Sequence, residues 1–292
     1  MIKAIKLSLY TLLIVVVIAF CLDWLYTYSY KNPVYARDKV SWMYSINEKK
    51  IKEYDYALFG SSRCIYHINP VQIERETGIK GINLGYSGSN PFEIKLMVHE
   101  FLEINQPDRI FVQLDDRFNR VHRDPISITP WIPFIRKPYL YEEIKKNDSL
   151  SFYLKNIPFY RYTQYESKLG IRNVALSYMK ENNFSELEGF KAMSGIAGKG
   201  KTKDYNLIDE PNPHILEIQR WCDELGVKVD FFTAPYYNRT INTAVIAKHV
   251  APYKDFSEIF DDRLYFSDPN HLNGKGAEEF TRIFIKEYFK IE

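Results

Sequence analysis

Two short segments near opposite ends of the chain carry residues that together could cleave or transfer an acyl group. Ser61 and Ser62 follow an apolar run directly, and Asp268 stands three residues before His271. A carboxylate at that spacing can hydrogen-bond one imidazole nitrogen and leave the other free as a base. Such a base would activate a serine hydroxyl for attack on an ester carbonyl.

A third segment offers backbone N–H groups for a negatively charged oxygen. Residues 83–90 (NLGYSGSN) also follow a short apolar run. Gly85 and Gly88 let the backbone approach a ligand closely or adopt a positive φ. Each segment also has an ordinary interpretation, as a turn around Ser62 or as a strand-to-helix loop capped by Asn90. Their joint occurrence favours a functional site.

The elements that must position these segments alternate between short apolar runs and amphipathic stretches. Strands are predicted at 54–59, 80–84, 109–114, 227–233 and 264–266, and helices at 70–77, 91–104, 214–225 and 275–289. This spacing predicts an α/β fold, a parallel five-stranded sheet with helices on both faces. Ligands bind such sheets at the carboxyl ends of the strands, where all three segments fall.

Residues from about 119 to 213 interrupt this alternation with prolines and aromatics, and we predict an insertion between the third and fourth strands. Within it, 195–202 (GIAGKGKT) matches the P-loop pattern. That motif needs a strand before it and a helix after it, and neither is predicted here. We therefore expect a basic glycine-rich loop and no bound nucleotide.

The first thirty residues predict a membrane anchor. Leu7–Leu22 contains no charged side chain, two lysines precede it and a Trp/Tyr cluster follows. Counted over residues 4–25, the segment reaches the roughly 20 residues that a bilayer needs, and the lysines favour a cytoplasmic N-terminus. A cleaved signal peptide is the rival interpretation, although the exit region lacks small residues at both cleavage positions. A buried core helix is a third.

We accordingly predict a transmembrane helix at 1–25, a linker at 26–50 and an α/β domain at 51–292 that lies in the periplasm or outside the cell. The chain of 292 residues is 46% hydrophobic and 26% charged, which excludes a disordered or polytopic membrane protein. A net charge of +2 argues against a nucleic-acid partner. Three cysteines match no metal pattern, and we do not expect Cys64 and Cys222 to pair.

The three chemistry-bearing segments resemble the blocks of the SGNH (GDSL-like) hydrolase superfamily, over roughly 54–118 and 214–290. Its first block ends in the serine nucleophile, its second carries an oxyanion glycine and its last holds Asp-x-x-His. The resemblance implies an SGNH/flavodoxin-like fold, a triad of Ser62, His271 and Asp268, and oxyanion binding by the N–H groups of Ser62 and Gly88. It implies neither a metal nor an organic cofactor.

One block departs from the family. Gly-x-Asn-Asp should follow the third strand, but residues 113–119 read QLDDRFN, without a recognisable oxyanion Asn. Losing one such donor typically lowers the rate ~10²–10³-fold. Arg117 or Asn119 is the predicted substitute, unless the backbone donors of Ser62 and Gly88 suffice or turnover is slow. The residues predicted to bind substrate are Arg63, Asn83, Gly85 and Asn90.

These observations predict an extracytoplasmic serine esterase or O-acyltransferase that acts on acyl esters of cell-envelope carbohydrate. The Gly-Ser-Ser-Arg variant is similar to membrane-anchored relatives such as the D-alanine transfer proteins of teichoic-acid systems. The expected partners are an acylated glycan or small acyl ester, the membrane through residues 4–25, and a membrane acyl-transfer protein. A non-catalytic carbohydrate-binding or assembly protein on a degenerate SGNH fold is the alternative, and an unrelated envelope scaffold is a third.

Overall fold

The computed structural model describes residues 1–32, 38–49, 54–179, 183–199 and 201–289. The chain forms two compact units. The first comprises Met1–Ser45 and Ile128–Asn182, and the second comprises Ile46–Ser127 and Asn183–Glu292. The predicted organisation differs, because much of the segment expected as an insertion into the sheet domain groups with the N-terminal residues.

The second unit is built on a five-stranded parallel sheet, which confirms the predicted α/β class. Its strands run in the order β2 (Gly81–Asn83), β1 (Tyr56–Phe59), β3 (Arg109–Gln113), β5 (Lys228–Thr233) and β7 (Tyr253–Asp255). Every neighbouring pair is parallel, so the carboxyl ends of all five strands meet at one edge.

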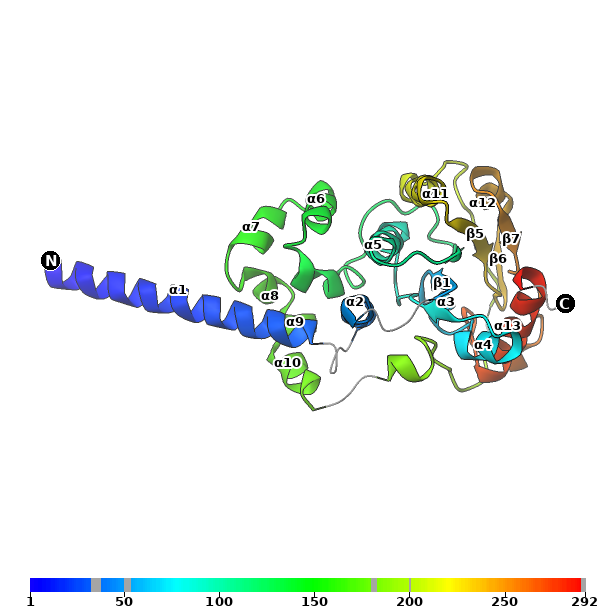
Figure 1. Ribbon diagram of the computed structural model, residues 1–292, viewed down its shortest axis with the longest axis horizontal. Helices are drawn as coiled ribbons and strands as arrows, with labels where there is room; N and C mark the ends of the chain where they lie inside the picture. Colours follow the sequence, from blue (N-terminus) through cyan, green and yellow to red (C-terminus); the bar gives the residue numbers. More distant parts are fainter. Residues whose placement is uncertain (33–37, 50–53, 180–182, 200, 290–292) are drawn as a thin grey trace. The chain divides into compact units, whose positions relative to one another are not determined.

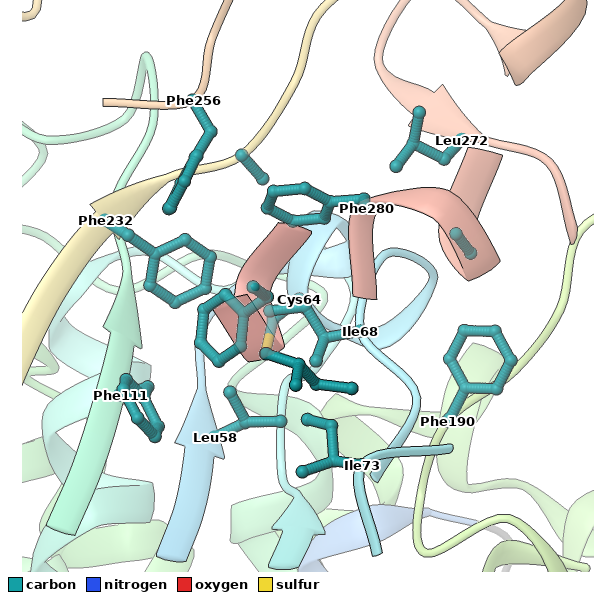
Figure 2. Close-up of a cluster of buried hydrophobic side chains, with 14 of the residues drawn as sticks. Leu58, Cys64, Ile68, Ile73, Phe111, Phe190, Phe232, Phe256, Leu272 and Phe280 are labelled. Atoms are coloured by element: carbon teal, nitrogen blue, oxygen red, sulfur yellow. The ribbon is translucent and has the colours of Figure 1, made fainter. Parts of the chain in front are cut away.

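Helices cover both faces of this sheet. On one face α4 (Pro70–Thr77) packs against α13 (Gly274–Tyr288), and on the other α5 (Pro91–Leu102) packs against α11 (Pro213–Leu225). Successive strand residues point to opposite faces. Leu58, Phe111 and Phe232 therefore share one cluster with Phe280 of α13 (Figure 2). Phe59 instead contacts Phe101 of α5, with ring centroids 5.7 Å apart.

An Asn-Pro pair begins three of these helices. Asn69, Asn90 and Asn212 are the N-caps of α4, α5 and α11, and a proline follows each at the first helical position. Proline suits that position because its missing N–H would have no partner there. Gly78 and Gly226 end α4 and α11 with positive φ, as the sequence predicts.

The predicted fifth strand at 264–266 is wrong. Arg263–Tyr265 forms a short 3-10 helix (η3), because the side chain of Asp262 accepts a hydrogen bond from Leu264 N and bends the chain. The two residues of β9 (His271–Leu272) then pair antiparallel with β8 (Phe266–Asp268). The fifth strand of the main sheet is β7 instead, which lies at one of its two edges. Its sequence, YKD, has no apolar run, since this strand is partly exposed.

The remaining elements of the second unit are short. They are α3 (Ser62–Ile65), η2 (Phe184–Glu186), β4 (Lys203–Tyr205), β6 (Arg239–Ile241) and α12 (Ala244–His249). Strands β4 and β6 form a separate parallel pair. Cys64 and Cys222 are buried free thiols.

The first unit holds the long apolar helix α1 (Ile2–Lys31), drawn in blue in Figure 1. An 18-residue window of α1 has a mean hydropathy of 2.5, none of it buried, so the helix is long and apolar enough to cross a membrane. Its C-terminal end packs through Tyr26 and Tyr30 against a small core. The other helices are α2 (Lys39–Lys49), η1 (Thr129–Phe134), α6 (Pro138–Asn147), α7 (Ser151–Asn156), α8 (Tyr160–Gln164), α9 (Glu166–Leu169) and α10 (Ile171–Ser177).

The segment predicted as a linker at 26–50 is mostly helical where the structure describes it, as the end of α1 and the whole of α2. Residues 33–37 and 50 of that segment lie outside the described residues. Residues 26–31 continue α1 because Tyr26 and Tyr30 pack in a buried cluster with Ile132 and Tyr162. Their spacing of four places both on one face of the helix.

Candidate active site

Ser62, His271 and Asp268 form a hydrogen-bonded chain beyond the carboxyl end of β1. Ser62 Oγ lies 2.8 Å from His271 Nε2, although 209 positions separate them in the sequence. His271 Nδ1 lies 2.8 Å from Asp268 Oδ2. The other carboxylate oxygen accepts the N–H groups of Asn270 and His271 at 2.8 and 3.1 Å. The structure thus brings together the three residues that the sequence singles out.

A tight turn presents Ser62. The chain leaves β1 at Gly60, and α3 starts at Ser62 with Ser61 as its N-cap. A Cβ at Gly60 would lie only 2.7 Å from Gln113 Cβ, so a larger residue would push the turn away from β3. Within the described part of the chain, the N–H groups of Ser62 and Gly88 have no protein acceptor, which leaves both available for a ligand oxygen.

A buried polar network fixes the residue before Ser62. Gln113 Oε1 accepts the Ser61 N–H at 3.0 Å, and Ser61 Oγ lies 2.8 Å from Asp115 Oδ2. Gln113 Nε2 donates to the same carboxylate oxygen at 3.2 Å. The sequence alone assigns Gln113 and Asp115 no role. A signal was present, because Gln113 is the polar last residue of an otherwise largely apolar strand and stands two residues before Asp115.

Arg63, which the sequence predicts to bind substrate, is buried. It is only 3% exposed, lies over the Tyr236 ring at 3.2 Å from its centroid, and donates to the carbonyl oxygens of Ala234 and Pro235. These contacts join α3 to the loop after β5. A role of Arg63 in substrate binding stays a prediction.

Asp116, the residue after Asp115, accepts a hydrogen bond from Tyr236 Oη at 2.9 Å. Burial raises the pKa of Asp116, and the neighbouring charge of Asp115 raises it further. The two aspartates and Tyr236 therefore extend the polar network from Ser61 to the loop after β5.

Arg117 is the candidate that lies beside the second block. Its Nη1 donates to Gly88 O and lies 3.3 Å from Asn90 Oδ1, and its own N–H donates to Asp115 Oδ1 at 2.9 Å. Gly88 has φ of 82°, a conformation that strains any residue with a side chain. Arg117 thus joins the third block to the glycine that the resemblance assigns to the oxyanion.

Asn119, the other predicted substitute, is engaged elsewhere. Its amide nitrogen donates to Ile208 O at 2.9 Å and to Glu210 O at 3.4 Å, and its oxygen accepts Ile208 N–H at 2.8 Å. Both amide hydrogens are used, so the structure does not offer this side chain to an oxyanion.

The other three predicted substrate-binding residues are also buried. Asn83 Nδ2 donates to the carbonyl oxygens of Cys64 and Ile68 at 2.8 and 3.0 Å, and its Oδ1 accepts Gly85 N–H. A Cβ at Gly85 would lie 2.6 Å from Cys64 Cβ, which makes it a packing glycine. Asn90 Nδ2 donates to a backbone carbonyl at 3.0 Å. All three make internal contacts that position the loops around Ser62.

Comparison with known proteins adds little. No family model matches the chain, and no curated protein does. Among solved structures, a protein of Streptococcus pneumonia provisionally described as a platelet activating factor is similar, with a TM-score of 0.33 and 12% identity. That similarity covers 98% of this chain and 99% of the other. A TM-score of 0.33 at 12% identity does not establish a shared function, so the function is inferred from the geometry of the site.

Glu93 joins the loop after β2 to the loop after β3. Its carboxyl oxygens accept Asp124 N–H at 2.7 Å and Asn90 N–H at 3.0 Å. Burial raises the pKa of Glu93 from 4.5 to about 8, despite these hydrogen bonds, which lower it. Between about pH 4.5 and pH 8, the Glu93 carboxyl is therefore protonated in the folded protein and ionised in the unfolded chain.

This shift gives a prediction for the pH dependence of stability. The pKa of Glu93 is higher in the folded protein than in the unfolded chain. The contribution of Glu93 to stability is therefore complete below about pH 4.5 and is lost as the pH rises through about 8. We expect the wild-type free energy of unfolding to fall relative to that of Glu93→Gln between these values. Urea unfolding of both proteins across this range measures the difference, and parallel curves would contradict the assignment.

His67 supports the loop that carries His271. It is fully buried, and its Nε2 accepts the N–H of Leu272 at 3.1 Å. The pKa of His67 lies well below its ordinary value, because burial disfavours the charged ring and the charges of Arg63 and His271 oppose it. Tyr66 packs edge-on against His271, with ring centroids 5.3 Å apart. The two rings fix the position of the imidazole.

We expect His67→Leu to destabilise the protein by ~1–3 kcal/mol, because the buried Leu272 N–H loses its acceptor. His67→Gln should recover part of this loss, since its amide oxygen can accept that hydrogen bond. Urea unfolding of the three proteins tests the assignment. Equal stability of the two variants would show that the hydrogen bond contributes nothing.

The glycine-rich segment that matches the P-loop pattern packs on the same loop. Ser267 Oγ donates to Ser194 O at 2.8 Å, Ala197 N donates to Phe266 O at 2.7 Å, and Gly274 N donates to Met193 O at 2.8 Å. Strand β4 follows it where a P-loop requires a helix, and Gly200 lies outside the described residues. The segment therefore supports the Asp268–His271 loop.

Proposed function

We propose that this protein is a serine esterase or O-acyltransferase in which Ser62 is the nucleophile. The Ser62–His271–Asp268 hydrogen-bonded chain carries the proposal. His271 Nε2 takes the proton from Ser62 Oγ as this oxygen attacks an ester carbonyl carbon. Asp268 holds His271 in the tautomer that leaves Nε2 unprotonated and stabilises the imidazolium that forms.

The second half of the reaction uses the same groups. The tetrahedral intermediate collapses, the ester C–O bond breaks, and the leaving alcohol takes the proton from His271, which leaves an acyl-Ser62 ester. Water or an acceptor hydroxyl then attacks that ester while His271 accepts its proton. The bond between the acyl carbon and Ser62 Oγ breaks, and His271 returns the proton to Ser62 Oγ. We assign the negative oxygen to the N–H groups of Ser62 and Gly88, with Arg117 placed against Gly88.

The substrates and location extend this proposal. We infer that α1 anchors the chain in a membrane with its N-terminus in the cytoplasm, because the helix is apolar and exposed over its first twenty residues and lysines precede its core. The second unit would then act outside the cytoplasm on acyl esters of envelope carbohydrate, with a membrane acyl-transfer protein as donor. Hydrolysis and transfer differ only in whether water or a sugar hydroxyl attacks the acyl-Ser62.

The chain supplies its own control for a test. His249 Nε2 lies 2.8 Å from Asp209 Oδ1, so a second His–Asp pair exists with the same N–O distance, although it is joined through the other ring nitrogen. We expect His271→Ala to abolish hydrolysis of p-nitrophenyl acetate by the purified full-length protein, whereas His249→Ala retains it. Equal rates in both variants would remove His271 from the mechanism.

A non-catalytic carbohydrate-binding protein is the second candidate. The observation that favours it is Asn119, whose amide is engaged with Ile208 and Glu210 and so does not replace the missing oxyanion donor. It predicts glycan binding that is unchanged in His271→Ala and no ester turnover by the wild type.

A further inference from the structure

Within the first unit, the helices after residue 128 contact α1 from the end of its charge-free stretch. Asp23 is the first buried residue of α1. Its Oδ1 accepts Phe159 N–H at 3.0 Å, and its Oδ2 accepts Arg136 and Arg161 at 3.0 and 2.9 Å. The hydrocarbon core of a bilayer is about 30 Å thick, or about 20 helical residues. If α1 spans it from residue 4, Asp23 lies at the bilayer boundary.

Exposed apolar side chains lie next to this boundary. Phe152 and Tyr153 on α7 and Ile157 just after it are 58%, 46% and 42% exposed, and we name these three the interfacial cluster. Leu154 of the same helix is 1% exposed, so α7 has one face in the core and one outside. Figure 1 shows α7 and α8 on the side of this unit that faces the N-terminal half of α1.

Hydrogen bonds hold the cluster at the level of Asp23. Arg136, which pairs with Asp23, also lies 3.4 Å from the carbonyl oxygen of Lys155, in the last turn of α7. Phe159, two residues after Ile157, contacts Tyr26 of α1, with ring centroids 4.9 Å apart. The interfacial cluster therefore lies within a few residues of the contacts with Asp23 and Tyr26, just after the charge-free stretch of α1.

The charges around the cluster suit an anionic surface. Residues 128–182 hold nine Lys or Arg and five Asp or Glu. The side chain of Arg136 is 51% exposed, and Lys155 Nζ lies 3.7 Å from the centroid of the Tyr141 ring. Aromatic rings beside basic side chains are typical of the headgroup layer of a bilayer, where anionic lipids attract Lys and Arg.

We propose that the interfacial cluster inserts into the headgroup layer of an anionic lipid bilayer and gives the first unit a second membrane contact beside α1. This proposal rests on the membrane anchoring proposed above. The contact would stop the unit from turning freely about the helix axis and would hold it at a fixed depth. The alternative occupants, a second copy of the chain or another protein, are distinguished by the test.

Nitroxide labels on single cysteines of the full-length protein in lipid nanodiscs test this contact. Three positions are compared in a Cys21→Ser background, whose other two native thiols are buried. Val15→Cys reports on the span and Phe152→Cys on the cluster. Lys31→Cys is the aqueous control, because it is exposed and lies about 12 Å beyond Asp23 along the helix.

In nanodiscs that contain phosphatidylglycerol, we expect the labels at 15 and 152 to be accessible to oxygen and protected from a water-soluble nickel reagent, and the label at 31 to show the reverse. In zwitterionic lipid alone, the nickel protection at 152 should weaken several-fold. A label at 152 that nickel reaches as readily as at 31, while 15 stays protected, overturns the contact and leaves the anchor intact.

Two further outcomes are also decisive. A label at 152 that neither reagent reaches means that protein covers the cluster, which overturns the lipid contact. A label at 15 that nickel reaches means that α1 does not span the bilayer, which overturns the anchor itself and with it this proposal. None of these outcomes bears on the role of Ser62.

Discussion

Ser62→Ala is expected to lower kcat/KM for an activated ester by about 10⁴-fold or more, to the level set by residual binding of the substrate and its oxyanion. The reason is that the variant lacks the atom that attacks the carbonyl, while His271 and Asp268 remain in place. Steady-state hydrolysis of p-nitrophenyl acetate by full-length wild type and variant gives the ratio.

The control for that experiment is Ser149→Ala, which removes an exposed hydroxyl from the first unit and should leave the rate within about twofold. The thermal unfolding temperature of Ser62→Ala should also stay close to that of the wild type, because the half-buried hydroxyl contributes one hydrogen bond. A variant that retains more than a tenth of wild-type activity would exclude Ser62 as nucleophile.

Asp268→Asn is expected to lower kcat by about 10⁴-fold with little change in KM. The amide oxygen can still accept the N–H groups of Asn270 and His271, so the loop keeps its shape. The amide nitrogen, however, donates to His271 Nδ1 and forces the ring proton onto Nε2. That tautomer cannot accept the proton of Ser62.

The measurement for this variant pairs kinetics with unfolding. Because the substitution is nearly isosteric, we expect kcat to fall while the unfolding temperature of Asp268→Asn stays close to that of the wild type. A variant that unfolds several degrees earlier with a proportionate loss of activity would instead assign Asp268 a purely structural role.

Within the main sheet, the sequence predicts the four buried strands and fails at β7, which is partly exposed. β1, β3 and β5 are near-continuous apolar runs because helices cover both faces of the sheet, and such runs are visible in the sequence. β7 pairs at the edge through its backbone, so Tyr253–Asp255 needs no apolar side chains and gives no such signal.

The site shows the same division. Ser62 and His271 stand out because their local motifs carry the chemistry. Asn83 has the polarity of a ligand-binding residue, yet it is fully buried and satisfies backbone carbonyls. Gln113 and His67 are likewise buried hydrogen-bonding groups, and their partners are 52 and 205 positions away. Sequence spacing cannot predict such pairs, because only the tertiary fold creates them.

Mapping the adduct of a fluorophosphonate on the full-length protein tests whether Ser62 is the activated nucleophile. This reagent phosphonylates a serine only when a neighbouring base removes its proton. We expect one adduct, which fragmentation of the labelled peptide places on Ser62 and not on the adjacent Ser61, and we expect it to be lost in His271→Ala. Folded wild-type protein that carries no adduct, or carries it on another residue, would exclude Ser62 as the nucleophile.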